Sequence, residues 1–170
     1  MSYTYPTGFP QGTACLFTNK LREVLIAEII AINGYQAHIA NSDMPDVNEA
    51  WHSIMEDEKK HYGWILSLLR RYDPVEYQMH LVNQARRAGP KSPMQAFTPQ
   101  YDRQIILNNL REDIKGELEA VILYEEELPL LPYPDIRDTL QAVIDEEKSH
   151  TEYLTEIVLK YDPDLYDGLD

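Results

Sequence analysis

The strongest constraint on the fold of this chain is an internal repeat that keeps one register without gaps. Shifting the 170-residue sequence by 89 positions superposes its first half on its second, so that Glu28 meets Glu117. Other matched pairs are Asn19 with Asn108, Arg22 with Arg111, Tyr35 with Tyr124, Asp46 with Asp135, Glu58 with Glu147, His61 with His150 and Asp73 with Asp162. Such a repeat indicates two copies of one supersecondary unit that share a core. Because a carboxylate and a Glu-x-x-His pair are repeated together, a symmetric site is the leading functional hypothesis.

Each repeat is predicted to be a hairpin of two helices. Apolar residues recur at three- and four-residue spacing in four long segments, 19–41, 46–72, 101–128 and 135–161. Prolines mark both hairpin turns, at Pro45 and within 129–134. Pro74 and Pro163 end the second and fourth helices, because the residue before a proline is pushed out of the helical region.

The segment 75–100 joins the second predicted helix to the third and is too long for a tight turn. With a short helix expected near Glu76–Arg87, it fits a crossover that runs the length of a helical bundle. We therefore predict an all-α fold, a four-helix bundle made of two pseudo-symmetric hairpins with a long crossover. The chain is expected to form one domain over 1–170, with hairpin repeats at 19–74 and 101–163.

Glutamates interrupt the apolar stripe of every predicted long helix near its middle, and on the second and fourth helices a histidine follows one turn later. These residues are Glu28, Glu58, His61, Glu117, Glu147 and His150. Burying four carboxylates is strongly unfavourable unless they are protonated, paired or bound to metal, and the stripes carry no lysine or arginine. Glu28 and Glu58 lie at similar distances from their hairpin turn, so all six side chains are expected at one level. The set suits two iron ions, with manganese as the alternative.

A single Glu-x-x-His pair on a helix more often belongs to a solvated surface. Here each pair begins 30 residues after a stripe-centred glutamate, which leaves a degenerate site without metal as the weaker alternative. Tyr35 and Tyr124 either hydrogen-bond a ligand carboxylate or simply pack. Trp51 and Trp64 are expected to pack in the core. Histidines without a counterpart in the other repeat receive no chemical role: His38, His52 and His80.

These residues resemble the ferritin-like di-iron carboxylate proteins, above all the rubrerythrin-type and bacterioferritin-type bundles, over about 19–163. The resemblance implies two bridging ligands and one pair of further ligands for each metal: Glu58 and Glu147 as bridges, Glu28 with His61, and Glu117 with His150. The positions of Tyr35 and Tyr124, seven residues after a ligand glutamate, also match the rubrerythrin-like pattern.

The sequence departs from that family in three respects. Ala120 stands where rubrerythrins usually carry an additional glutamate, so the ligand exchange associated with that residue is not expected. A rubredoxin-like domain is absent, which implies an external electron donor. The short fifth helix that ferritin cages generally have is also absent, which disfavours a self-assembled storage shell.

The resemblance implies a di-iron oxidoreductase that reduces hydrogen peroxide or dioxygen, as a rubrerythrin-like peroxidase or ferroxidase active against oxidative stress. The alternative is a non-catalytic iron-binding protein that handles iron, for example as cargo of a separate shell. A third reading is a structural bundle with a vestigial site. Whether the chain forms a homodimer stays open.

Composition narrows the expected partners and location. A formal net charge of −14 repels phosphate backbones and anionic membranes, so nucleic acid is not expected as a partner. The single cysteine, Cys15, excludes a Cys-x-x-Cys metal site within this sequence and fits a reducing compartment. No segment approaches the roughly 20 apolar residues of a membrane span. A cytoplasmic location is therefore expected.

Overall fold

The computed structural model describes residues 16–84 and 98–162, and this part of the chain is helical without strands. Its helices are α1 (Phe17–Asn41), α2 (Pro45–Tyr72), α3 (Pro74–Gln84), α4 (Arg103–Glu127) and α5 (Pro134–Tyr161), with a short 3-10 helix, η2 (Leu128–Leu130), after α4. The predicted all-α class is confirmed. The four long helices end within two residues of the predicted positions.

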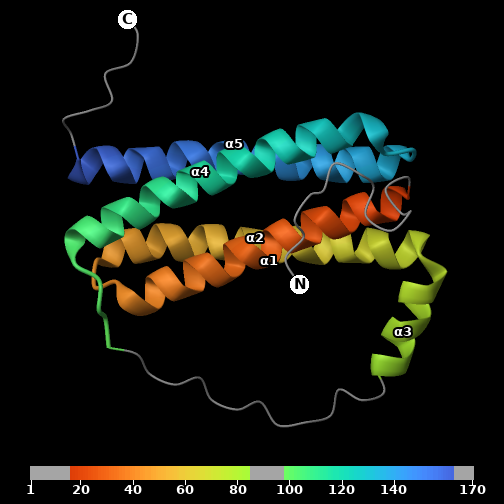
Figure 1. Cartoon of the computed structure of the whole chain (residues 1–170), viewed down its shortest axis with the longest axis horizontal. Helices are drawn as coiled ribbons and strands as arrows, with labels where there is room; N and C mark the ends of the chain where they lie inside the picture. Colours follow the sequence, from red (N-terminus) through yellow and green to blue (C-terminus); the bar gives the residue numbers. More distant parts are fainter. Residues whose placement is uncertain (1–15, 85–97, 163–170) are drawn as a thin grey trace, which may run out of the picture.

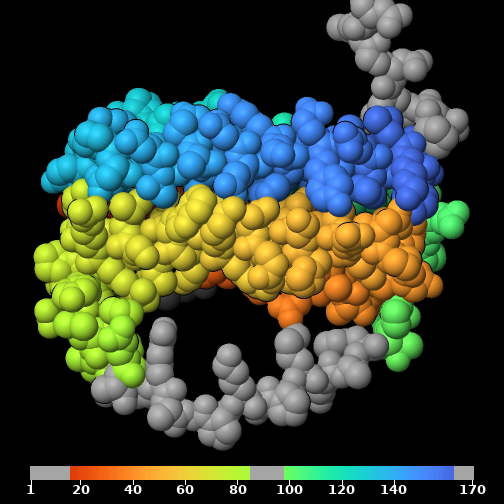
Figure 2. All heavy atoms as spheres, turned by 180° about the vertical axis from the view of Figure 1, so that it is seen from behind, coloured from red at the N-terminus to blue at the C-terminus, as the bar shows by residue number. Residues whose placement is uncertain are grey.

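The four long helices form two hairpins that stack on each other (Figure 1). α1 pairs with α2 and α4 with α5, while α1 lies beside α4 and α2 beside α5. Figure 2 shows the opposite face, where the side chains of α2 and α5 meet along the length of both helices. α2 and α4 run in the same direction (Figure 1), which is the arrangement expected for a bundle with one long crossover.

The connection between the hairpins begins at one end of the bundle and finishes at the other. α3 continues from α2 at the far end, and α4 starts close to the turn between α1 and α2 (Figure 1). The backbone N–H groups of Gln100 and Tyr101 both donate to the carbonyl of Asn41, at 3.1 and 2.9 Å. These bonds attach the start of α4 to the end of α1. The predicted short helix corresponds to α3, although the end predicted for it and the rest of 85–97 lie outside the described residues.

The repeated polar motifs outside the stripe centres fasten the helix ends. Arg22 at the start of α1 donates to Asp73 at the end of α2 at 2.5 Å. Its repeat counterpart Arg111 makes the same bond to Asp162. A second bond joins the two hairpins, since the hydroxyl of Tyr72 donates to Asp135 at 2.8 Å. Its counterpart runs from Tyr161 to Asp46 at 2.5 Å.

Two apolar cores fill the bundle on either side of its middle. One contains Leu21, Ile65 and Ile144, and the other contains Trp51 and Leu110, all fully buried or nearly so. Each buried side chain of this size contributes about 1.5–3 kcal/mol through the hydrophobic effect. The middle layer between these cores is the one in which the stripe glutamates lie. Among the described helices, none is both long and apolar enough to cross a membrane.

Candidate metal centre

The predicted ligands occupy the buried layer between the two apolar cores. α1 and α4 contribute one glutamate each, while α2 and α5 contribute a glutamate and a histidine three residues apart, on the same side of the helix. All six side chains are at most 6% exposed: Glu28, Glu58, His61, Glu117, Glu147 and His150. The structure thus brings together every residue that the repeat singled out.

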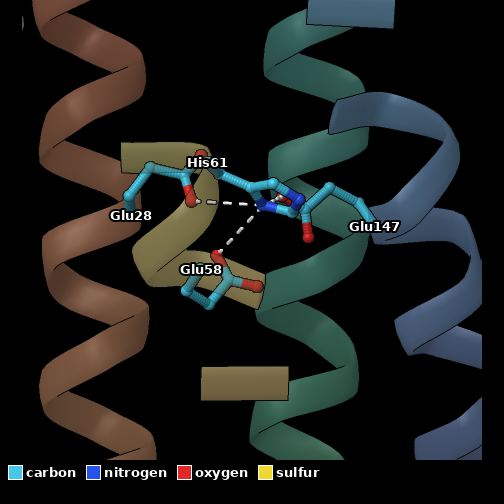
Figure 3. Close-up of side chains that lie close together, drawn as sticks. All are labelled: Glu28, Glu58, His61 and Glu147. Carbon is cyan, nitrogen blue, oxygen red and sulfur yellow. Dashed lines mark ion pairs between the residues drawn. The ribbon is translucent and has the colours of Figure 1, made fainter. Parts of the chain in front are cut away.

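The six side chains form two overlapping clusters that share Glu58 and Glu147. Glu28 and His61 complete the first cluster, and within it one ligand atom of each residue lies within 4.8 Å of the others. Figure 3 shows this cluster with His61 pointing toward the three carboxylates. Its Nδ1 is 3.3 Å from Glu147, 3.6 Å from Glu28 and 3.8 Å from Glu58.

The second cluster has the same composition and comes from the other repeat. Glu117 and His150 join the shared Glu58 and Glu147. The Nδ1 atom of His150 lies 3.3 Å from both Glu58 and Glu117 and 3.2 Å from Glu147. The two imidazole rings are stacked with their centroids 5.9 Å apart. The two clusters are therefore adjacent and joined through two carboxylates.

Without a cation, burial and mutual interaction divide the six groups by protonation state. Burial raises the pKa of Glu28 to about 8 and raises that of Glu117 well above its usual range. Burial also favours the protonated form of Glu58 and Glu147, but the hydrogen bonds from the two histidines outweigh it. The pKa of Glu58 is therefore lowered, and that of Glu147 is lowered to about 2.

The histidines respond in the opposite sense. Burial favours the neutral ring, but the surrounding carboxylates outweigh it and raise the pKa of His61 strongly and that of His150 to about 12. The directions of these shifts favour a metal-free site with two imidazolium ions, ionised Glu58 and Glu147, and protonated Glu28 and Glu117. These charges sum to zero, as expected for a desolvated cluster.

Several inward-facing atoms of the site have ion-pair contacts but no hydrogen bond. Within the described residues, these buried atoms are His61 Nδ1, Glu28 Oε2, Glu58 Oε1 and Glu147 Oε1, and their contacts with the opposite charges of the site are 3.3–3.6 Å long. Orphaned buried polar atoms are costly, and here they converge on one place. Oxygen and imidazole donors are the ligands that iron and manganese accept. The residues therefore fit a pair of such ions.

The two core tyrosines link the repeats crosswise. Tyr124 on α4 donates its hydroxyl hydrogen to Glu28 on α1 at 2.7 Å. Tyr35 on α1 makes the corresponding bond to Glu117 on α4. Of the two sequence readings for these tyrosines, the structure favours hydrogen bonding to a carboxylate of the site. Burial and the neighbouring carboxylates raise the pKa of both phenols, so they stay protonated donors.

Two acidic residues that the sequence analysis missed contact the outer nitrogens of the histidines. Glu146 on α5 accepts from Nε2 of His61 on α2 at 2.9 Å. Asp57 on α2 lies 3.5 Å from Nε2 of His150 on α5. Lys60 pairs with both acids, at 2.7 and 2.8 Å. The signal was present, since an acidic residue immediately precedes the shared glutamate in each repeat.

A cavity of about 360 Å³ reaches the site from the side opposite the histidines. It opens between α1 and α4, and Glu58, Glu117 and Glu147 form its inner end together with Tyr35 and Tyr124. The histidine side is instead covered by Asp57, Glu146 and Lys60, which the close contact of α2 with α5 holds in place. An external molecule can thus approach the carboxylates from one direction.

The prediction for the tryptophans is half right. Trp51 is fully buried, but Trp64 is 37% exposed. Position 64 precedes the buried Ile65 by one residue, about 100° around the helix, which places Trp64 at the edge of the stripe. Its ring contacts His61 and lies beneath the ammonium group of Lys60.

One histidine set aside in the sequence analysis belongs to a polar network at the cavity wall. Asp113, which lines the cavity, accepts a 2.8 Å hydrogen bond from the indole N–H of Trp51. The same Asp113 oxygen lies 3.1 Å from Nδ1 of His38. The repeat comparison could not find this network, because its members have no counterparts in the other half of the chain.

Comparison with known proteins supports the fold but gives no close relative. No protein-family model matches the sequence, and no curated protein matches it. A manganese catalase from Anabaena, KatB, superposes with a TM-score of 0.65 over 98% of this chain and 83% of its own, at 17% identity. A hypothetical protein from Pyrococcus furiosus superposes with a TM-score of 0.62 over 94% of this chain and 100% of its own, at 21% identity. At these identities the likeness shows the helical bundle.

Proposed function

We propose, starting from the ferritin-like fold of this chain, that the protein is a di-metal oxidoreductase that reduces hydrogen peroxide or dioxygen. The observation that carries the proposal is the pair of overlapping clusters joined through Glu58 and Glu147. Glu28 and His61 would hold one ion and Glu117 and His150 the other, with the two shared glutamates between them. A bound pair of iron or manganese ions supplies two electrons, the number that reduction of one peroxide requires.

The surrounding residues keep the ligands in one protonation state and orientation. Glu146 accepts the Nε2 hydrogen of His61, and a carboxylate in this position fixes the tautomer that leaves Nδ1 free to bind a metal. Tyr124 holds one oxygen of Glu28 and leaves Oε2 facing the site. Tyr35 acts in the same way on Glu117. These contacts arrange the donors before a cation arrives, which reduces the reorganisation that binding would need.

Repeated turnover as a reductase needs a source of electrons for each new cycle. The only cysteine of the chain is Cys15, so a four-cysteine iron site cannot form within the 170 residues. Electrons for each new cycle therefore come from an external donor.

A second candidate is peroxide disproportionation, which consumes two peroxides per cycle and needs no external reductant. The likeness to a manganese catalase over 98% of this chain favours it. The metal and the need for a reductant separate the two candidates.

The test is to load the metal-free protein with Fe²⁺ or with Mn²⁺ and to follow peroxide and dioxygen together. Reductase activity predicts peroxide loss that continues only with a reductant and releases no dioxygen. Disproportionation predicts one dioxygen for every two peroxides without reductant. Double substitution Glu58→Gln and Glu147→Gln should abolish both metal uptake and turnover. The matched control is Glu56→Gln, since Glu56 lies on α2 with its side chain 54% exposed. Metal uptake of fewer than two ions per chain would contradict the proposal.

A further inference from the structure

The cavity between α1 and α4 is larger than its suggested substrates require. Its volume of about 360 Å³ falls within the range of roughly 300–1,000 Å³ that is typical of small-molecule sites. Hydrogen peroxide and dioxygen are close in size to a water molecule, which occupies about 30 Å³ in the liquid. A passage for such small oxidants alone would not need this space.

The cavity is polar at its inner end and mainly apolar along its walls, although Glu112, Asp113 and Glu119 of α4 also line it. Its inner end carries the carboxylates and phenols of the site, whereas Ala27, Ile30 and Ala31 on α1 and Ala120 and Leu123 on α4 form the walls. These side chains are small or apolar, so an apolar group fits between them.

Exposed side chains on the α1 side of the cavity are apolar, whereas those on the α4 side are acidic. Ile30, which lines the cavity, is 67% exposed, and Ile26 one turn before it on α1 is 51% exposed. Glu112 and Glu119 line the cavity from α4. In the other repeat the positions of Ile26 and Ile30 are taken by Lys115 and Glu119. The fold thus accepts charged residues at these two positions, so it does not account for the isoleucines. Exposed apolar side chains beside a cavity provide surface that an apolar ligand can cover.

We propose that the substrate of this site is an organic hydroperoxide whose apolar group lies in the α1–α4 cavity while its O–O–H group reaches the carboxylates. The inference rests on the proposed di-metal function. In the reaction the O–O bond breaks, ROOH takes up two electrons and two protons, and an alcohol ROH and water form. The two electrons come from the reduced metal pair and are replaced by an external one-electron donor, used twice per cycle. The two protons come from water.

Two glycines in the cavity wall allow it to be filled without harming the fold. Gly34 on α1 and Gly116 on α4 line the cavity, and a Cβ atom added at either meets no atom within 4 Å. Leucine is also far more favourable than glycine inside a helix. The double variant Gly34→Leu and Gly116→Leu should therefore fold and narrow the cavity. Gly63 on α2 has equally open space but does not line the cavity, so Gly63→Leu is the matched control.

The experiment has one readout that does not depend on turnover. Titration calorimetry measures binding of 2-phenylpropan-2-ol, the product alcohol of cumene hydroperoxide, to the full chain without metal. Saturable binding is expected, with a dissociation constant raised at least tenfold in the double variant and unchanged in the control. In the metal-loaded protein, the double variant should lower kcat/KM for cumene hydroperoxide at least tenfold more than kcat/KM for hydrogen peroxide.

The outcomes separate this inference from the proposed function. If hydrogen peroxide is turned over but the alcohol does not bind, or if the double variant affects both peroxides equally, the organic hydroperoxide is the wrong substrate class. If the alcohol binds and the double variant prevents it while neither peroxide reacts, the cavity is a ligand site and the oxidoreductase function fails. The proposed substrate is then overturned as well, because it rests on that function.

Discussion

Binding of two divalent cations to the metal-free protein should release about four protons near neutral pH. The perturbation is the addition of two equivalents of Mn²⁺ or Zn²⁺ per chain at pH 7. His61 and His150 must each lose a proton before Nδ1 can bind metal, and both pKa values are raised above their usual range. Glu28, with a pKa raised to about 8, is about nine-tenths protonated at pH 7, and burial shifts the pKa of Glu117 in the same direction.

Charge balance in the buried site also predicts the release of four protons. Two divalent cations bring four positive charges into a layer that is neutral without them, and the loss of four protons leaves it neutral again. A desolvated cluster with a large net charge would be strongly unfavourable. Since metal binding competes with these protons, the product of the two association constants should rise by up to about four decades per pH unit below pH 8.

The assay is titration calorimetry at pH 7 in buffers with different ionisation enthalpies. The slope of observed enthalpy against buffer ionisation enthalpy gives the number of protons released. The Glu28→Gln variant lacks one of the four groups that lose a proton. It should release about three protons per chain at metal concentrations that saturate the site. Glu56→Gln, which changes an exposed acid on α2, should leave the number at four. A wild-type value below two would mean that the site is already deprotonated, and the charge assignment would be wrong.

Three further outcomes follow from the same contacts. The free energy of unfolding without metal should peak near pH 5 in urea titrations. The stability from the raised pKa of Glu28 is complete below about pH 4.5 and is lost as pH rises through 8, a fall of about 3 kcal/mol between pH 5 and 8. The stability from the lowered pKa of Glu147 is lost as pH falls through 2. Glu146→Gln should weaken metal binding about 10- to 100-fold in competition with a chelator, whereas Glu152→Gln on the exposed side of α5 should not. Tyr124→Phe should cost about 1–3 kcal/mol in the metal-free protein, because it leaves a buried oxygen of Glu28 without its donor.

The ligand layer could be predicted because its geometry depends on counting residues along helices. The turn between the first two helices is marked by Pro45, and the two glutamates lie equally far from its two ends, Glu28 13 residues before Asn41 and Glu58 13 residues after Pro45. The rise per residue therefore places both glutamates at the same level of the bundle. The repeat then fixes the same level in the second hairpin. The pairing of the two hairpins was predicted from the same residues, since burying four carboxylates is strongly unfavourable unless protonation, pairing or a shared metal site compensates for it.

Features that depend on neighbouring helices could not be predicted in the same way. Asp57 and Glu146 reach the histidines of each other's hairpin, which requires knowing that α2 and α5 lie side by side. The cavity requires that small residues on α1 face small residues on α4. Trp64 was misplaced for a related reason, because a helix stripe has edges whose burial is set by the neighbouring helix.

Comparison of the two repeats also shows that one polar network is present in only one half of the chain. Asp113, Trp51 and His38 form a polar network beside the cavity. The positions equivalent to Asp113 and Trp51 in the other half hold Val24 and Leu140, which are buried and apolar, and the position equivalent to His38 holds Glu127, which pairs with Lys20 instead. Burying an aspartate is unfavourable unless its partners compensate for the lost hydration. The other repeat forms the same helix hairpin with Val24 at the position of Asp113. The network is therefore not a requirement of the bundle. Asp113 lines the cavity near Glu117, whereas its counterpart in the other half is the apolar Val24, so two identical sets of ligands lie in unequal surroundings.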